Sequence, residues 1–254
     1  MKKFLGLLKK EWVLYRSWWL AAIVVGLIFI YCGEYFLNRL TNVTDPRVIF
    51  TSWVLILGTF FVVIQFLASI HNDLKTKEIW LHSTSSIAQL VGVKFIFTLV
   101  SSAIFLTIIS VIGLFLSQDF IEGTFMQISF LHFMTVANLF IIQCLLILIA
   151  LLFFVLNEYF KKRFGRLAFI ISFGTFILIM KLWAEFNESG YYAKILYHGE
   201  IPIDGLTAYL PQSNGSSFFT IIGSFYVIEG LAYLIGYSLL YVVATKWLEK
   251  VLLR

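Results

Sequence analysis

The sequence predicts an all-helical, polytopic membrane protein with six transmembrane helices and both termini in the cytoplasm. Of its 254 residues, 60% are hydrophobic and only 13% are charged, which is far from the balance of a soluble domain. The charged residues fall in short clusters, and the apolar runs between them reach the roughly 20 residues that cross a hydrocarbon core. A water-soluble fold is therefore excluded.

The apolar runs define a single six-helix transmembrane domain over residues 20–254. The predicted spans cover residues 20–37, 48–70, 95–117, 128–156, 167–183 and 219–244. The connections that matter most are two cytoplasmic loops, 71–94 and 157–166, and a large extracellular loop, 184–218. None of these loops is long enough to hold a separate soluble domain.

The positions of Lys and Arg set the predicted orientation in the cell (plasma) membrane. Fifteen of the 19 lie near the two termini or in loops 71–94 and 157–166. Short segments rich in Lys and Arg stay on the cytoplasmic side, so both termini are expected there. Loop 157–166 is either an anchor of this kind or a second contact with a cytoplasmic partner.

Residues 1–19 predict an amphipathic helix that lies in the membrane interface. Its apolar positions recur at helical spacing with Lys and Arg between them, and Trp18 and Trp19 mark the boundary with the first span. The alternative is a basic tail that only sets the topology. The apolar positions are Phe4, Leu8, Trp12 and Tyr15.

Loop 71–94 is patterned like a pair of short helices. Asn72 or Asp73 can cap a helix that extends through residues 79–81, and Ser86 with Gln89 forms a capping box that begins the next helix. Residues 79–81 are Ile-Trp-Leu, displayed where either a partner protein or the lipid headgroup layer could cover them. The residues alone leave docking and a membrane-lying turn both open.

The order of these features resembles the permease subunits of ABC-2 type ABC exporters. The first intracellular loop of that family carries an acid, a basic residue, Thr, a Glu two positions later, apolar residues, a turn and Gly-Lys. This chain departs from the pattern in having Lys75 where Gly is usual, no Pro near Thr84, and Val93 between the last two matching residues. The matching residues are Asp73, Lys75, Thr76, Glu78, Ile79, Leu81, Ser83, Gly92 and Lys94.

The resemblance implies a coupling helix over residues 73–83 that sits in a separate cytoplasmic ABC ATPase subunit, which would hold ATP and Mg²⁺. It also implies a dimer, in which a second permease copy or a paralogue supplies the other half of the path. Small Gram-positive members of this kind resemble exporters of cytolytic or antimicrobial peptides. The implied ATPase-coupling residues are Asp73, Lys75, Thr76, Glu78, Ile79, Trp80 and Leu81.

The chain is not expected to be an enzyme itself. It contains no Gly-x-x-x-x-Gly-Lys-Ser/Thr phosphate loop, so ATP hydrolysis needs another polypeptide. Its four histidines lie far apart and its two cysteines fall in separate apolar runs, which argues against a metal site. We therefore expect no catalytic residue, no cofactor and no metal ligand in this chain, and no contiguous basic stripe suggests nucleic acid.

Glu229 is the candidate functional carboxylate of the last span. A carboxylate at membrane depth faces a partner, water or a cavity. Tyr226, Tyr233 and Tyr237 are predicted on the same helical face, where they could line a translocation cavity for an amphipathic, cationic cargo. The alternative is a helix interface in which a protonated Glu229 bonds a neighbouring Tyr.

The predicted extracellular loop 184–218 folds over the exit of the path. Residues 195–203 suggest a small hairpin about His198 and Gly199, whereas the resemblance implies short re-entrant helices. The resulting hypothesis is a permease subunit that exports an amphipathic or lipid-like cargo, above all peptide toxins. The alternative is a membrane sensor or immunity component that binds membrane-active peptides without transporting them.

Overall fold

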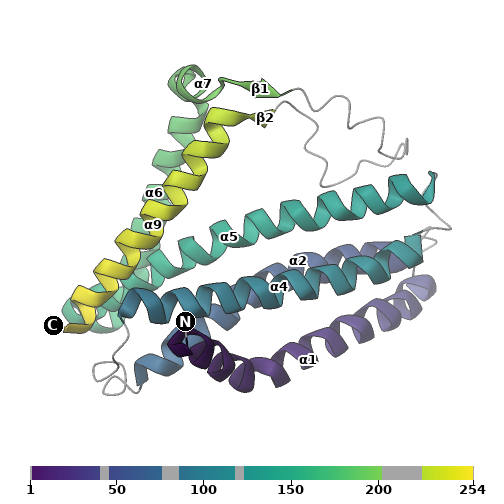
Figure 1. The fold of residues 1–254 in the computed structure, drawn as a ribbon, viewed down its shortest axis with the longest axis horizontal. Helices are drawn as coiled ribbons and strands as arrows, with labels where there is room; N and C mark the ends of the chain where they lie inside the picture. The colour runs from purple at the N-terminus through teal and green to yellow at the C-terminus, as the bar shows by residue number, and fades with distance from the viewer. Residues whose placement is uncertain (1, 41–45, 76–85, 118–122, 202–224, 254) are drawn as a thin grey trace. The chain divides into compact units, whose positions relative to one another are not determined.

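The computed structural model describes residues 2–40, 46–75, 86–117, 123–201 and 225–253, and over these residues the chain is almost entirely helical (Figure 1). The long helices are α1 (Lys2–Leu40), α2 (Pro46–Lys75), α4 (Ile87–Ser117), α5 (Phe125–Phe164), α6 (Ala168–Glu188) and α9 (Val227–Leu253). The shorter elements are the 3₁₀ turn η1 (Gly165–Leu167), helix α7 (Gly190–Leu196) and strands β1 (Glu200–Ile201) and β2 (Phe225–Tyr226).

Five helical stretches among the described residues are long and apolar enough to cross a membrane. One of them, Phe125–Glu188, has 64 residues and contains α5, η1 and α6. The other stretches are Phe4–Tyr35, Pro46–Lys75, Ile87–Leu116 and Val227–Val251. The predicted class, a helical membrane protein with several transmembrane helices, is confirmed.

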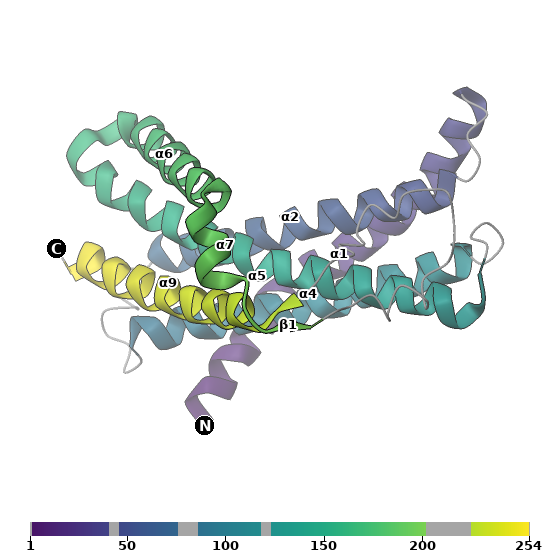
Figure 2. The same cartoon turned by 90° about the horizontal axis from the view of Figure 1, so that it is seen from above.

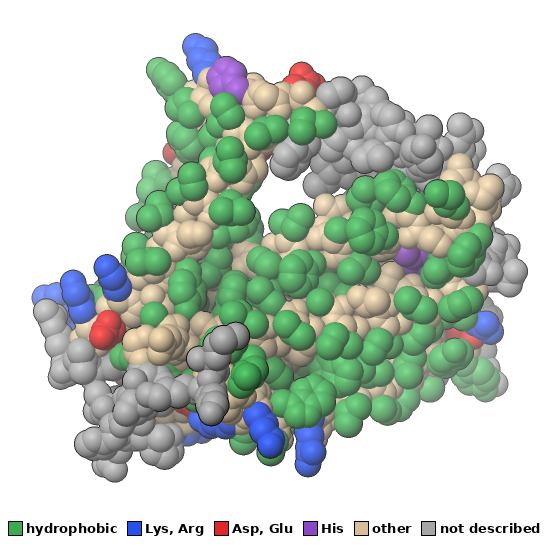
Figure 3. All heavy atoms as spheres, in the orientation of Figure 1, with side chains coloured by type: hydrophobic (Ala, Val, Ile, Leu, Met, Phe, Trp, Pro, Cys, Tyr) green, Lys and Arg blue, Asp and Glu red, His purple; other side chains and the backbone are tan. Residues whose placement is uncertain are grey.

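The surfaces of these helices suit a lipid environment. Hydrophobic side chains cover much of the surface visible in Figure 3, and exposed ones such as Val25, Phe115 and Leu234 occur along the long helices. Inside the helices, hydroxyl groups bond the carbonyl one turn earlier, as Thr59 Oγ1 does with Leu55 O at 3.0 Å. A polar side chain in hydrocarbon needs such a partner, and these bonds supply it within the helix itself.

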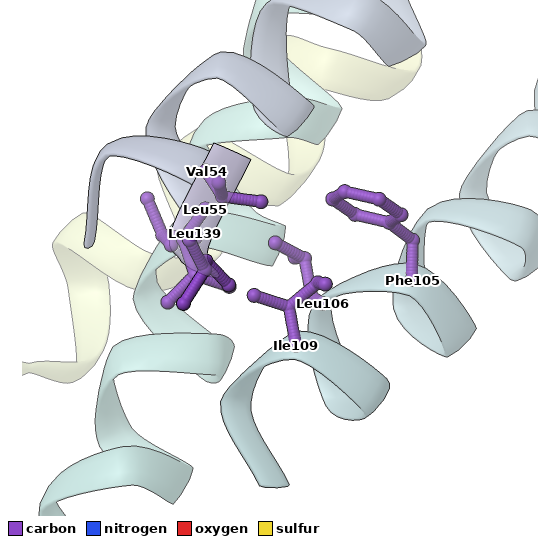
Figure 4. Close-up of a cluster of buried hydrophobic side chains, with 7 residues drawn as sticks. Val54, Leu55, Phe105, Leu106, Ile109 and Leu139 are labelled. Carbon is purple, nitrogen blue, oxygen red and sulfur yellow. The ribbon is translucent and has the colours of Figure 1, made fainter. Parts of the chain in front are cut away.

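The chain divides into two compact units. The described part of the first unit comprises residues 2–40, 46–72, 92–117 and 123–144, and its core is a cluster of apolar side chains from α1, α2, α4 and α5 (Figure 4). The ring of Phe105 packs directly against Gly58, a position where any side chain would collide with it. The cluster consists of Ile30, Val54, Leu55, Phe105, Leu106, Ile109 and Leu139.

Helix α1 of the first unit has two parts that differ in direction. Figures 1 and 2 show that its N-terminal part runs in a different direction from the longer remainder, although the helix is continuous. Tyr15, in the N-terminal half, is buried and its ring lies 6.5 Å from that of Phe97 on α4. Phe4 and Trp12 are exposed, and the predicted position of this stripe in the membrane interface stays a prediction.

The second unit contains residues 73–75, 86–91, 145–201 and 225–253 of the described chain. Gly165, with φ of 55°, allows the tight reversal between α5 and α6. Phe153 then contacts Phe169 and Phe176 of α6, with ring centroids 5.8 and 6.1 Å apart. Tyr159 contacts Trp247 at 5.6 Å, which places α9 against α5.

Helix α7 lies at the C-terminal end of α6 and the N-terminal end of α9, beside the paired strands β1 and β2 (Figures 1 and 2). The two strands are antiparallel, with Glu200 opposite Tyr226 and Ile201 opposite Phe225. The expected hairpin about His198 and Gly199 is therefore wrong, because β1 pairs with the segment that precedes α9. Gly199, with φ of 71°, turns the chain between α7 and β1.

Two helices continue beyond the apolar runs that mark the predicted spans. Helix α2 extends to Lys75, so Asn72 and Asp73 lie inside it and do not cap a new helix. Helix α5 extends to Phe164, through most of the predicted loop 157–166. Lys and Glu are good helix formers, and only the tight turn at Gly165 ends the helix.

The start of α4 agrees with the sequence prediction. Ser86 immediately precedes the helix, and its Oγ accepts a hydrogen bond from Gln89 N at 3.2 Å. The predicted N-cap is confirmed, since this bond satisfies one of the free N–H groups of the first turn.

Candidate functional site

Glu229 lies in the first turn of α9 and is joined to α7 by a hydrogen bond. Tyr192 of α7, which is 4% exposed, donates its hydroxyl proton to Glu229 Oε1 at 2.6 Å. A carboxylate in the first turn of a helix is also favoured by the partial positive charge of the helix N-terminus. Two sources of stabilisation therefore hold Glu229 at this position.

Tyr233, one turn after Glu229, completes the arrangement that we call the Tyr192 cluster: Tyr192, Glu229 and Tyr233. The hydroxyl oxygens of Tyr192 and Tyr233 are 2.8 Å apart. Because Tyr192 gives its single proton to Glu229, Tyr233 must donate to Tyr192. Burial, together with the hydrogen bonds to Glu229 and Tyr233, raises the pKa of Tyr192 well above its ordinary value, so the phenol stays protonated at a pH where an ordinary tyrosine ionises.

Aromatic rings enclose the Tyr192 cluster. The Tyr192 ring meets Phe186 and Tyr197 edge-on, at centroid distances of 5.8 and 5.7 Å. Tyr197 in turn stacks on Tyr226 of β2 at 4.5 Å. These contacts connect α6, α7, β2 and α9, so this end of the second unit is built from aromatic side chains around one carboxylate.

The predicted cavity residues are thus only partly brought together. Glu229 and Tyr233 meet through Tyr192, and Tyr237 lies beside Tyr233 with centroids 6.0 Å apart. Tyr226 is not on their helical face, because α9 begins at Val227 and Tyr226 belongs to a strand. That part of the prediction is wrong. The last span was also expected to be helical at Phe225 and Tyr226, where the structure has a strand.

The bond from Tyr192 to Glu229 is the kind of contact expected for a helix interface. The role of these residues in a translocation cavity stays a prediction.

Sequence reasoning missed Tyr192. Its available signal was weak: a Tyr pair, Tyr191 and Tyr192, after an apolar span in a segment expected to be irregular.

A second polar cluster, also missed, lies inside the first unit and joins three helices. Lys94 Nζ of α4 lies 2.6 Å from Glu11 Oε1 of α1, with side-chain exposures of 2% and 4%. Ser69 of α2 accepts a hydrogen bond from Lys94 Nζ at 2.6 Å and donates one to Glu11 Oε2 at 2.8 Å. We call Glu11, Ser69 and Lys94 the Glu11 cluster.

The arrangement of the Glu11 cluster satisfies the groups it buries. Taking a carboxylate and an ammonium group out of water is costly, and only good geometry with extra hydrogen bonds offsets that cost. Sequence reasoning counted Lys94 among the charges of loop 71–94 and gave Glu11 no role. The start of α4 at Ile87 places Lys94 within the second turn of a helix, where it can reach inward.

The predicted coupling residues lie mostly outside the described residues. Asp73 and Lys75 form the polar last turn of α2. Thr76, Glu78, Ile79, Trp80 and Leu81 fall in the segment 76–85, which the structure does not describe. Their role therefore stays a prediction.

Within the described parts of the chain, no group of three or more His, Cys, Asp or Glu side chains could hold a metal ion. The fold and these clusters define a helical membrane protein whose polar residues connect helices to one another. Comparisons with protein-family models, with curated proteins and with solved structures found no match for this chain.

Proposed function

We propose that the chain is the transmembrane permease subunit of an ATP-driven ABC exporter. In this proposal it has six transmembrane helices, with α5 and α6 crossing separately, and both termini lie in the cytoplasm of a cell whose plasma membrane it spans. Two permeases, identical or paralogous, form the path, and a separate ATPase subunit binds ATP and Mg²⁺ and drives it. The cargo class is an amphipathic or lipid-like molecule such as a membrane-active peptide.

The observation that carries the proposal is the connection between α2 and α4. It bears the motif residues of the resemblance, from Thr76 to Ser83, and it joins two long helices. At one end α2 continues past its apolar run to Lys75, and at the other end α4 begins at a Ser86 cap. One long helix leads into the coupling segment and another leaves it, and such helices are suited to carry a movement of the segment into the membrane.

The Glu11 cluster supports the same proposal. Ser69 lies six residues before the end of α2 and Lys94 lies seven residues after the start of α4. Both are bonded to Glu11, so the two helices that flank the coupling segment are tied to α1. A displacement of the segment would therefore move three helices together.

Co-purification with the ATPase encoded beside the chain tests the proposal. The coupling variant carries Glu78→Ala and Trp80→Ala. The matched control carries Phe120→Ala and Glu122→Ala, which removes the same kinds of side chain at the same spacing from a connection expected on the opposite side of the membrane. We expect one ATPase per permease for wild type and control, and loss of the ATPase from a coupling variant that still elutes as a folded protein.

The proposal is wrong if no ATPase co-purifies with folded wild type, or if both variants retain it equally. In the first case the sensor or immunity hypothesis takes its place. Peptide-stimulated ATP turnover in proteoliposomes separates the two functions further, because a sensor binds the peptide without driving turnover.

A further inference from the structure

A narrow apolar groove runs between α1 and α4 in the first unit. Its volume is about 310 Å³, and its lining is almost wholly apolar. Each helix contributes four residues; from α4 they range from Phe97 to Ile104, seven residues apart. That separation corresponds to about 10 Å along the helix, within the roughly 15 Å of one leaflet's hydrocarbon.

The walls of the groove are almost wholly apolar, and the Trp19 indole N–H is already hydrogen-bonded. Trp19 donates its indole N–H to Ser101 O at 3.0 Å, so that its ring remains for packing. The Trp12 ring is 6.2 Å from the Trp19 ring and is 45% exposed. On the facing helix, Val100 is 54% exposed, although it lines the groove.

One end of the groove carries a cation. Lys9 contributes to the lining, and it is exposed, so its aliphatic stem can cover the groove while its ammonium group remains in the aqueous layer. Lys and Arg side chains also gather below the N-terminal part of α1 in Figure 3. Tryptophan and lysine together are typical of the level where lipid headgroups meet hydrocarbon.

We infer that this groove binds an anionic phospholipid, with one acyl chain between α1 and α4 and the phosphate at Lys9. The inference needs only that α1 and α4 lie in a membrane, and it is independent of the exporter proposal. A lipid is a better occupant than a protein helix, because the apolar lining ends at an exposed lysine that matches an anionic headgroup. An acyl chain is thinner and needs no polar partner, and a lysine at this depth attracts anionic headgroups.

Native mass spectrometry of the detergent-purified protein tests the headgroup. Phosphatidylglycerol and phosphatidylcholine with identical acyl chains are added at equal concentrations. Wild type should retain phosphatidylglycerol preferentially. Lys9→Gln should lower its apparent affinity for phosphatidylglycerol about fivefold, the change expected for one interfacial cation. Lys10→Gln, the same charge change at a neighbour that does not line the groove, should have a smaller effect.

A second pair of variants tests the acyl-chain site. Val100→Trp fills the groove and should abolish retention of both lipids. Ile96→Trp adds the same ring at an exposed residue of α4 that does not line the groove, and it should leave retention unchanged. Equal retention by all four variants would overturn the inference. So would a Val100→Trp variant that loses a dimer but keeps the lipid, since the groove would then be a contact between two copies.

Discussion

Lys94 Nζ lies 2.6 Å from Glu11 Oε1, and both side chains are almost fully buried. The pair joins the N-terminal part of α1 to α4, and Ser69 of α2 bonds both partners. The N-terminal part of α1 exposes Lys, Phe and Trp side chains, and its buried Glu11 holds it to α2 and α4. This contact makes residues 2–15 part of the folded unit.

The first prediction concerns that pair. Lys94→Met leaves the Glu11 carboxylate buried without its cation and should destabilise the protein by about 3–5 kcal/mol. Adding Glu11→Met to the same chain should recover much of the loss, because two apolar side chains of similar volume need no compensation. Thermal melting in one detergent, at one pH, measures both. Equal melting of wild type and Lys94→Met would contradict a buried ion pair.

The second prediction concerns the Tyr192 hydroxyl. Tyr192→Phe removes the donor to Glu229 and the acceptor for Tyr233, and should cost about 1.5–3 kcal/mol because one partner is a carboxylate. Tyr191→Phe is the matched control, since that neighbouring ring is 71% exposed. Both are compared by thermal melting at pH 8. A control that melts as low as Tyr192→Phe would show that the bond contributes little.

The third prediction follows from the raised pKa of Tyr192. The folded protein holds this phenolic proton more tightly than the unfolded chain, whose Tyr pKa is about 10. The stability it contributes is therefore complete below about pH 10 and is lost progressively as the pH rises above that value. Melting temperatures from pH 8 to pH 11 should show the gap between wild type and Tyr192→Phe narrowing above pH 10. A constant gap would mean that the pKa is not raised.

The fourth prediction concerns close packing in the first unit. Gly58 faces the Phe105 ring, and an added Cβ would collide with it, so Gly58→Ala should destabilise by about 1–3 kcal/mol. Gly174→Ala is the control, because nothing lies within 4 Å of its added Cβ, and it should be neutral or stabilising by up to about 1 kcal/mol. Melting temperatures are compared with that of wild type. A Gly58→Ala variant that melts at or above the temperature of wild type would contradict the prediction.

The sequence predicted what local chemistry determines. Long apolar runs located the helices, and the spacing of Ser86 and Gln89 located the start of α4. The ends of α2 and α5 lie beyond the predicted spans, since polar residues continue a helix past its apolar run. The start of α9 was misplaced because the β1 partner that holds Tyr226 in a strand is 26 residues earlier in the chain.

The two polar clusters were beyond sequence reasoning for a related reason. Glu11 and Lys94 are 83 residues apart, and Tyr192 and Glu229 are 37 apart. Helical and strand periodicities relate residues only a few positions apart, so only tertiary packing brings these partners together. In each case one partner was assigned a role from its neighbours in sequence: Lys94 as a topology charge and Glu229 as a carboxylate in the outer half of the last span.

The last prediction separates the two roles open to Glu229. Glu229→Gln keeps an oxygen that can accept the Tyr192 proton but removes the carboxylate charge. If Glu229 only joins α9 to α7, the variant should lose about 1 kcal/mol, the difference between a charged and a neutral hydrogen bond, and keep its cargo response. If the carboxylate also attracts a cationic cargo, cargo-stimulated ATP turnover should fall while melting changes equally little. Melting and turnover measured on one preparation distinguish these results, and the Tyr192→Phe variant provides the reference, because it breaks the contact but keeps the carboxylate.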